Sequence, residues 1–331
     1  ISKLQAGDVI HIAGGVYLGR GSNGADIITV PVSIIGGYSD DFSVRNPWGE
    51  YKTILSGDNM DKNWEASPRL MIDLMKYRGK EMPPILVDGV IVDHAGRNRY
   101  KTDEQLEIVR AASPKSGQMP TPDMGGLVIR VSKTGNFEAD AMWDITVQNC
   151  IVMNTAPTQG ALSVAGYKNS KIKIRNNVVI NNTGTGIMTG TKYITSNEDE
   201  MPEFLIENNT VLFTWKYDPI VQSFSGNSIS LDGGTVNIVH NNVLGFADRF
   251  GINNASRASI LLKDNIIFGN VDSDYLEFDT RIALEDIEDE AEHLHEDSEG
   301  NIDEPIKVPV DSEWAKNYAS RVMIDRNALE A

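Results

Sequence analysis

The chain of 331 residues lacks several features that define common protein classes. It has a single cysteine, Cys150, so it cannot form an intrachain disulfide. It has no run of about 18 apolar residues, so we expect no transmembrane segment. Positive charge is also scarce: 30 Lys and Arg stand against 47 Asp and Glu, which gives a formal net charge of −17. No nucleic-acid partner is expected, because phosphate backbones are bound by clustered cations.

Metal-binding patterns are scarce as well. Only His293 and His295 lie close together among the five histidines, and no spacing typical of a zinc site occurs. Four polar residues alternate around a glycine and loosely resemble a calcium loop: Asp297, Glu299, Asn301 and Asp303. No Glu stands at the twelfth position that an EF-hand requires. Ca²⁺ is thus the one cofactor that the sequence suggests, with these four residues as its candidate ligands.

What the sequence does contain is a repeat. Apolar residues alternate with others and are followed by a turn residue in six copies: 85–90, 145–150, 172–177, 205–209, 238–242 and 261–266. Weaker copies at 33–37 and 53–57 continue the series upstream. A period of roughly 20–35 residues with β-branched alternation predicts a parallel β-solenoid. The interval from Gly89 to Cys150 is much longer than the others, so it holds two units or one unit with a long insertion.

Each copy predicts a strand, a bend and a second strand. Alternation sends one set of side chains inward, and Asn or Gly at the bend adopts left-handed backbone angles at low cost. One row of turn residues should stack and bond neighbouring backbone: Asp88, Asn149, Asn176, Asn208, Asn241 and Asp264. Cys150 lies in such a turn and is expected to be structural. Third strands that close the coils are predicted at 126–131, 160–164, 186–188, 227–231 and 251–253.

Two N-terminal sequence segments resemble those of a known family. Residues 4–17 read Leu-Gln-Ala-Gly-Asp-Val-Ile-His-Ile-Ala-Gly-Gly-Val-Tyr, and residues 31–43 read Pro-Val-Ser-Ile-Ile-Gly-Gly-Tyr-Ser-Asp-Asp-Phe-Ser, followed by Arg45-Asn46-Pro47. With the repeat, they resemble bacterial secreted and cell-surface proteins of the pectate-lyase-like superfamily. The resemblance covers residues 1–270. It implies an all-β, single right-handed parallel β-helix and a secreted, periplasmic or cell-surface location in a bacterium, but one fold hosts many functions.

The domain organisation predicted from these patterns is one solenoid and one cap. The solenoid has about eight to ten coils of three strands each over residues 1–270. Residues 271–331 should form an acidic, partly helical C-terminal cap, with helices at 275–294 and 312–319. Four insertions interrupt the repeat at about 58–84, 94–125, 191–203 and 215–227, and solenoids usually carry function on such insertions.

Candidate catalytic residues gather in the longest insertion. It holds the densest cluster of cationic residues in the chain, which also includes one aromatic residue: His94, Arg97, Arg99, Tyr100 and Lys101. Arg can grip a carboxylate with two bonds, and Lys or Arg can act as a base toward an acidic sugar proton. Arg130, on a predicted third strand, is a further candidate. The alternative is a loop whose cations pair with nearby Asp and Glu.

Two other sets of residues could contact a ligand. Five residues would face outward on the third strands if Leu127, Ile129, Leu162, Ile229 and Leu231 face inward: Arg130, Ser163, Ser230, Asp232 and Asn253. In polysaccharide lyases of the superfamily, the cleft lies along a comparable face. Aromatic residues near turns could stack on sugar rings or close strand ends over the core: Trp48, Trp64, Trp143, Trp215 and Tyr217.

Three functions fit these observations. The first is an extracellular or surface β-helix that binds glycan or serves a structural role, because no catalytic constellation is recognisable. The second is a polysaccharide lyase or epimerase that acts on acidic polysaccharide with a Lys or Arg base. The third is a subunit of a larger extracellular assembly. The expected partner is thus a polysaccharide, a surface protein or further copies of the chain.

Overall fold

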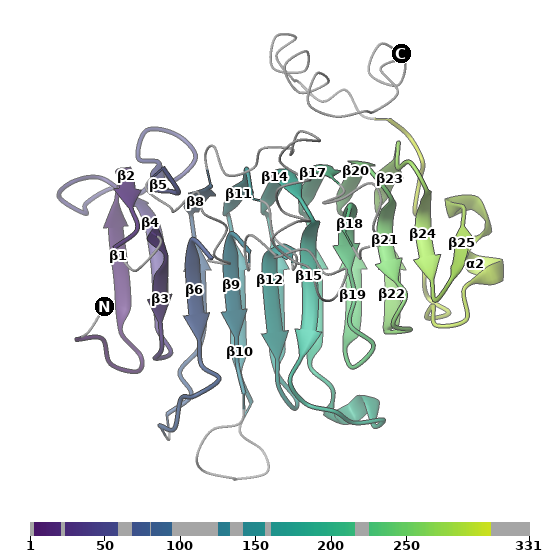
Figure 1. The fold of residues 1–331 in the computed structure, drawn as a ribbon, viewed down its shortest axis with the longest axis horizontal. Coiled ribbons are helices and arrows are strands. Elements are labelled where there is room, and N and C mark those ends of the chain that lie inside the picture. The colour runs from purple at the N-terminus through teal and green to yellow at the C-terminus, as the bar shows by residue number, and fades with distance from the viewer. Residues whose placement is uncertain are drawn as a thin grey trace, which may run out of the picture.

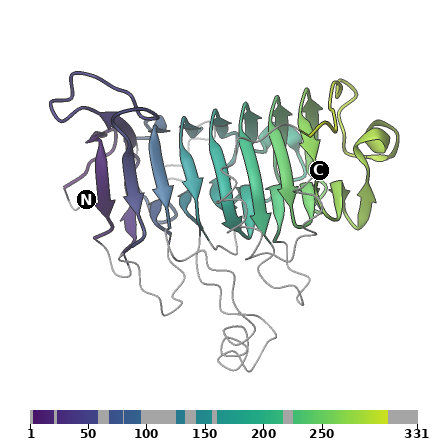
Figure 2. The same ribbon diagram turned by 90° about the horizontal axis from the view of Figure 1, so that it is seen from above.

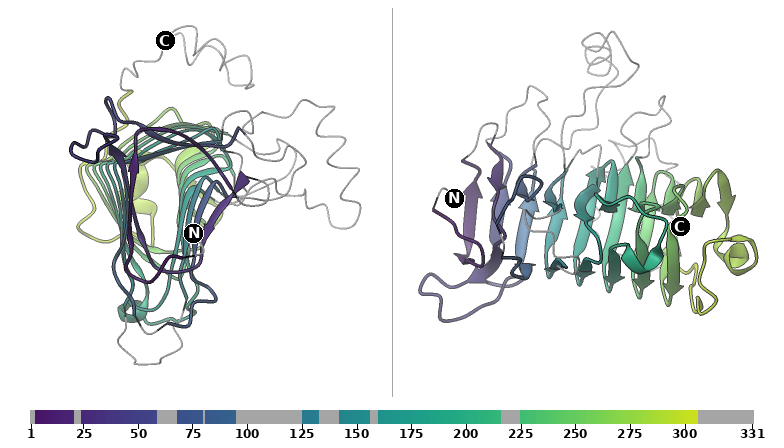
Figure 3. Two further views of the ribbon diagram at one scale, coloured as in Figure 1. Left: turned by 90° about the vertical axis from the view of Figure 1, so that its left-hand side faces the viewer. Right: turned by 90° about the horizontal axis from the view of Figure 1, so that it is seen from below.

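The computed structural model describes residues 3–20, 24–58, 68–79, 81–94, 125–132, 142–155, 160–215 and 225–305. Over these residues the chain winds into a parallel β-helix with three strands per coil, and equivalent strands of successive coils lie side by side along the long axis (Figures 1 and 2). Viewed end-on, each coil has three sides (Figure 3). We name the three sheets A, B and C in the order in which each coil enters them.

Sheets A and B each have eight parallel strands. Sheet A comprises β1 (Val9–Ala13), β4 (Ser33–Tyr38), β7 (Ile85–Asp88), β10 (Asp144–Gln148), β13 (Lys171–Arg175), β16 (Glu203–Glu207), β19 (Val236–His240) and β22 (Ser259–Lys263). Sheet B comprises β2 (Gly15–Leu18), β5 (Thr53–Ser56), β8 (Val90–Asp93), β11 (Ile151–Met153), β14 (Val178–Thr183), β17 (Thr210–Trp215), β20 (Val243–Ala247) and β23 (Ile266–Phe268). The described residues therefore form eight complete coils, within the expected range.

Sheet C closes the coils and confirms the predicted third strands. It comprises β3 (Asp26–Ile28), β6 (Leu70–Asp73), β9 (Leu127–Arg130), β12 (Gly160–Gly166), β15 (Thr185–Thr191), β18 (Asn227–Ser230), β21 (Phe250–Asn254) and β24 (Ser273–Glu277), and β25 (Thr280–Ile282) pairs antiparallel with β24. The five residues predicted to face inward on these strands all lie in the core: Leu127, Ile129, Leu162, Ile229 and Leu231. Period-2 alternation thus places the apolar side chains as expected.

Two expectations about the repeat need correction, and the structure decides between two alternatives for a third. Residues 53–57 are not another first strand, because β5 belongs to sheet B and β4 pairs directly with β7. The interval from Gly89 to Cys150 is one unit with an insertion, since Ile85 pairs with Ile145 on the next strand of sheet A. The insertion at 58–84 contains β6, a strand of sheet C. Short apolar runs followed by Gly occur in both first and second strands, so sequence pattern alone did not separate them.

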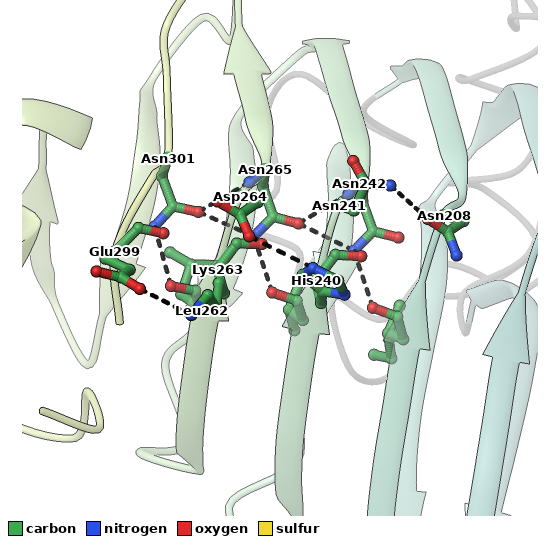
Figure 4. Close-up of polar contacts among 12 residues, drawn as sticks. Asn208, His240, Asn241, Asn242, Leu262, Lys263, Asp264, Asn265, Glu299 and Asn301 are labelled. Carbon is green, nitrogen blue, oxygen red and sulfur yellow. Dashed lines mark hydrogen bonds and ion pairs between the residues drawn. The ribbon is translucent and has the colours of Figure 1, made fainter. Parts of the chain in front are cut away.

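The buried turn row lies one residue beyond the expected one. Five asparagines stack at the corner between sheets A and B, and each of the first four donates its Nδ2 to the Oδ1 of the next at 2.9–3.0 Å: Asn177, Asn209, Asn242, Asn265 and Asn301. Figure 4 shows the last three of them. The expected residues instead hold the left-handed bend, with φ between 52° and 56°: Asn149, Asn176, Asn208, Asn241 and Asp264. Asp88 ends β7, and Gly89 takes the bend of that coil.

The C-terminal end differs from the prediction. The expected helix at 275–294 is wrong, because this stretch holds β24, β25, a 3₁₀ turn (Leu284–Asp286) and one short helix, α2 (Ile287–Glu290). Tyr275, Ile282 and Ile287 are buried in the core from these separate elements, so their helical spacing is coincidental. Parallel bridges from Leu294, Glu299 and Ile302 to β22 and β23 add part of a further coil. The predicted helix at 312–319 lies outside the described residues.

Candidate functional site

The predicted cationic cluster is described only at its first member. His94 follows β8, is fully buried, and donates its backbone N–H to the carbonyl oxygen of Met153 at 3.2 Å. Arg97, Arg99, Tyr100 and Lys101 lie outside the described residues, so their catalytic role stays a prediction. Because His94 is buried, it fits a structural role at the start of the insertion better than direct contact with a polymer.

Arg130 lies on the outer face of sheet C, as expected. It ends β9 in register with Asp73 on β6, and its Nη2 lies 2.9 Å from the Asp73 Oδ2. Its Nε is buried and has no hydrogen-bond partner. A guanidinium carries N–H donors and no acceptor. In this setting Arg130 offers N–H donors to a ligand, while a role as a base remains untested.

A row of short polar side chains crosses the outer face of sheet C. Ser163 on β12, Met188 on β15, Ser230 on β18 and Asn253 on β21 occupy equivalent positions in successive strands. We call Ser163, Ser230 and Asn253 the outer polar row. Their residues are only 7%, 7% and 4% exposed, so these side chains are recessed. Four of the five residues predicted to face outward therefore do so: Arg130, Ser163, Ser230 and Asn253.

Neighbouring side chains order part of the row. Asn227 donates its Nδ2 to the Ser230 Oγ at 3.2 Å, and the Asn253 Oδ1 accepts the backbone N–H of Ala255 at 3.0 Å. The Ser163 hydroxyl has no side-chain hydrogen bond within the part of the chain that the structure describes. Asp232, the fifth predicted residue, instead follows β18 and shapes a turn, where its Oδ1 accepts the Gly234 N–H at 3.0 Å. Ser163 is therefore the member of the row whose hydroxyl is available to a ligand.

A second cationic region, which the sequence did not suggest, lies at the start of β21. The guanidinium of Arg249 lies 4.8 Å from the centroid of the Phe250 ring, and its Nε lies 3.1 Å from the Asp272 Oδ2. Arg281 reaches the same oxygen at 3.9 Å and its side chain is 58% exposed. The only signal in the sequence was an Arg-Phe pair directly before a predicted third strand. Arg130 and Arg249 thus lie toward opposite ends of the outer polar row.

The candidate calcium ligands have other partners. The Glu299 Oε1 lies 2.7 Å from the Lys263 Nζ, and this hydrogen bond lowers the pKa of Glu299. Asn301 continues the buried asparagine row, where its Oδ1 accepts the N–H and the Nδ2 of Asn265. Asp297 and Asp303 are exposed. In the described ranges no group of three or more His, Cys, Asp or Glu side chains is arranged to hold a metal ion. Calcium binding here stays a prediction.

Two of the three described candidate aromatic residues are buried and cannot stack on a sugar. Trp143 is 1% exposed in the core, and its Nε1 donates to the Ser132 carbonyl at 3.0 Å. Trp215 is 3% exposed. Trp48 alone is widely exposed among the described candidates, at 48%, and its Nε1 donates to the Asn149 carbonyl at 2.7 Å. Trp64 and Tyr217 lie outside the described residues.

Comparison of the chain with protein-family models, with curated proteins and with solved structures finds no match. Over the residues that the structure describes, no helix has the length and apolar character needed to cross a membrane.

Proposed function

We propose that this protein is an extracellular or surface β-helix that binds an extended glycan along the outer face of sheet C. The observation that carries the proposal is the outer polar row, in which hydroxyl and carboxamide groups occupy equivalent positions on β12, β18 and β21, with Met188 on β15 in between. Neighbouring parallel strands lie about 4.8 Å apart, so Ser230 and Asn253 are one strand spacing apart and Ser163 and Ser230 are two. A linear polymer of sugar units presents hydroxyls at a comparable repeat, so one chain can contact several coils.

The character of the side chains supports binding. Recessed Ser and Asn side chains lose little conformational freedom when a ligand binds, which favours affinity. Arg130 and Arg249 add N–H donors, and a guanidinium can hold a carboxylate through two bonds. A polymer that carries uronate groups would therefore bind in preference to a neutral one.

Binding to a panel of neutral and acidic polysaccharides by affinity electrophoresis tests this proposal. We expect Arg130→Gln to weaken binding of an acidic glycan at least about tenfold, which corresponds to about 1.4 kcal/mol. Ser163→Ala should also weaken it, because the hydroxyl is removed without adding bulk at this recessed position. Arg175→Gln is the matched control, since Arg175 lies on sheet A and donates its Nε to the Gln148 Oε1 at 2.9 Å. No binding across the panel, or an equal loss in Arg130→Gln and Arg175→Gln, would overturn the proposal.

The same panel separates binding from cleavage. The absorbance of unsaturated uronate is recorded with each polyuronate, with and without Ca²⁺, because a lyase creates this chromophore. If it forms, and disappears in Lys101→Ala and Arg99→Ala, the protein is a lyase and the binding-only proposal is wrong. A particle mass of several chains under the same conditions would instead support a subunit of an assembly.

A further inference from the structure

The outer face of sheet A has an apolar centre in the C-terminal half of the solenoid. From β13 to β22, the second and fourth residues of each strand are buried, so the first, third and fifth face outward. The third residue is large and apolar on three successive strands, and all three side chains are only partly buried: Leu205, Ile238 and Leu261. With Val236, the first residue of β19, they form what we call the sheet A patch.

Charged side chains surround the sheet A patch. The outward positions of β13 to β22, with Glu299 beyond them, hold four cations and three carboxylates: Lys171, Lys173, Arg175, Lys263, Glu203, Glu207 and Glu299. This face thus carries a formal charge of +1, whereas the whole chain carries −17. An apolar centre with a polar rim is the usual build of a protein–protein interface. The face can also approach another acidic chain with less repulsion than the rest of the surface.

Some of the rim charges have no partner within the chain. Lys263 pairs with Glu299 at 2.7 Å, and Figure 4 shows this pair beside His240. Arg175 and Glu207 are neighbours in register on β13 and β16, but neither forms an ion pair within the described part of the chain. Contacts inside the chain therefore do not account for these two charges, and both are available to a partner.

We propose that two copies of this chain form a dimer through the outer faces of sheet A, related by a two-fold axis that runs along β19. Viewed end-on, successive coils lie nearly behind one another, so sheet A has little twist and can pack flat against an identical face (Figure 3). The axis places β19 opposite β19 of the second copy and β16 opposite β22. The outer face of sheet C stays free, so the dimer is compatible with the glycan binding proposed above.

This axis places apolar side chains opposite apolar ones. Ile238 and Val236 each lie opposite the same residue of the second copy, because both are on the axis. Leu205 on β16 lies opposite Leu261 on β22, since each is one strand away from β19 in the same row. All four residues of the sheet A patch thus become buried against one another.

The same axis places unlike charges opposite each other at the rim. Glu207 on β16 lies opposite Lys263 on β22 of the second copy. One strand further out, Arg175 on β13 lies opposite Glu299, which bridges to Lys263. The two-fold symmetry makes each of these contacts twice. The charges that lack a partner within one chain therefore gain one in the dimer.

Neighbouring placements of the axis fit less well. An axis along β16 would place Glu207 opposite Glu207, and like charges that face each other weaken an interface. An axis between β13 and β16 opposes unlike charges at the rim, but it places Lys173 opposite Leu205 and Thr146 opposite Ile238. Only the axis along β19, among these three, matches the apolar centre and the charged rim together.

The size of the contact sets the expected strength of the dimer. Five strands of five residues cover roughly 20 by 17 Å of sheet, or about 300 Å². Stable specific interfaces bury about 800 Å² of each partner. We therefore expect a reversible dimer that dissociates on dilution.

Sedimentation velocity of the full chain over a concentration series tests the proposal. The wild type should change from the mass of one chain to that of two as its concentration rises. Ile238→Asp places two negative charges on the axis and should weaken the dimer at least about tenfold. Thr146→Asp is the matched control, because Thr146 occupies the same outward row on β10, outside the contact. A wild type that stays monomeric throughout, or an equal effect of both variants, would contradict the proposal.

Exchange of charges between chains tests the axis itself. Glu207→Lys and Lys263→Glu each place like charges opposite each other, so each variant alone should dimerise at least about tenfold more weakly than the wild type. In an equal mixture, the introduced lysine of one chain faces the introduced glutamate of the other, and dimers should form again. A contact within a single chain cannot be restored by mixing. Urea unfolding checks that each variant is folded, and a mixture as monomeric as its two components would rule out this dimer.

Discussion

The two short corners of each coil solve the same problem with different residues. At the corner between sheets A and B, a left-handed residue is followed by a buried asparagine, and five asparagines stack without interruption. At the corner between sheets B and C, the left-handed residues change along the solenoid: Asn154, Asn181, Phe213, Phe246 and Gly269. The first corner is thus held by amide hydrogen bonds from Asn177 to Asn301, and the second by amides at one end and aromatic rings in the middle.

The difference shows which requirement is strict. Both corners need a left-handed residue, and Phe213 and Phe246 meet it at φ of 56° and 55°, although bulky residues rarely do. Their rings stack at 5.0 Å with an angle of 11° between planes, so packing offsets the backbone cost. The bend is therefore a fixed feature of the coil, and the stacked groups that stabilise it are interchangeable when they repeat from coil to coil.

The largest expected effect comes from breaking the asparagine row. Asn209 accepts the Asn177 N–H and Nδ2 at 3.0 Å and donates to the Ile174 carbonyl at 2.9 Å. Asn209→Ala leaves these buried groups without partners, and we expect a loss of about 3–5 kcal/mol in the free energy of unfolding. Urea unfolding measures it.

The adjacent turn residue provides the control for Asn209. Asn208 is exposed at φ 56° and lies outside the buried row. Asn208→Ala should cost only about 1–2 kcal/mol, from the left-handed backbone and from the loss of the exposed hydrogen bond that the Asn208 Oδ1 accepts from the Asn241 Nδ2. Equal losses in the two variants would mean that the bend, and not the amide row, dominates the stability of this corner.

The second prediction addresses the aromatic part of the other corner. Phe213 is 3% exposed and packs in the hydrophobic cluster outside sheet B, so Phe213→Ala should cost about 3 kcal/mol. Phe213→Asn loses the same ring but tolerates the left-handed angle, and should therefore be less destabilising than Phe213→Ala by about 1 kcal/mol. Urea unfolding of both variants checks the order. If the alanine variant is the more stable of the two, the backbone at Phe213 is not strained.

The corners also explain how much the sequence revealed. The period, the turn residues and the inward positions of the third strands predicted the solenoid, because each follows from local chain geometry. The identity of the buried row was missed, since Asn-Asn pairs do not show which member turns inward. The Phe bends were invisible as bends, because nothing in the sequence marks Phe as left-handed. The hairpin of β24 and β25 was predicted as helix because its core residues fall by chance at helical spacing.

The candidate site was predictable in part, for the same reason. Outward positions such as Arg130, Ser163 and Ser230 follow from alternation along one strand. The relation of Arg249 to Asp272 and Arg281 depends on which coils stack, and this information is not local. Sequence reasoning therefore identified the face but not the cations at its C-terminal end.

The third prediction extends the asparagine row by one member. Cys150 takes the place of an asparagine: its N–H donates to the Asn177 Oδ1 at 3.0 Å, and its Sγ lies 3.7 Å from the Val87 carbonyl oxygen. Asn177 makes the equivalent bond to the Val147 carbonyl through Nδ2 at 3.1 Å. Cys150→Asn should therefore stabilise the protein by about 1 kcal/mol, because an amide replaces a weak thiol donor. Urea unfolding tests this, and a destabilised variant would mean that the coil of Val87 is too tight for an amide.

The smallest effect concerns the C-terminal end of the corner between sheets B and C, where Asn270 donates its Nδ2 to the Asp274 Oδ1 at 3.0 Å. Partial burial, with a smaller contribution from the charge of Asp303, raises the pKa of Asp274. A carboxyl whose pKa is higher in the folded state favours folding while it is protonated, and this contribution is lost as the pH rises through that pKa. Between about pH 3 and pH 7, the unfolding free energy of the wild type should therefore fall relative to that of Asp274→Asn, and the fall should start near the ordinary Asp pKa of about 3.9.

Asp279→Asn removes the same charge from an exposed position and controls for net charge. If urea unfolding gives the two variants the same pH dependence, the Asp274 carboxyl carries no cost of burial. The two corners of the coil would then differ only in the side chains that stack at them.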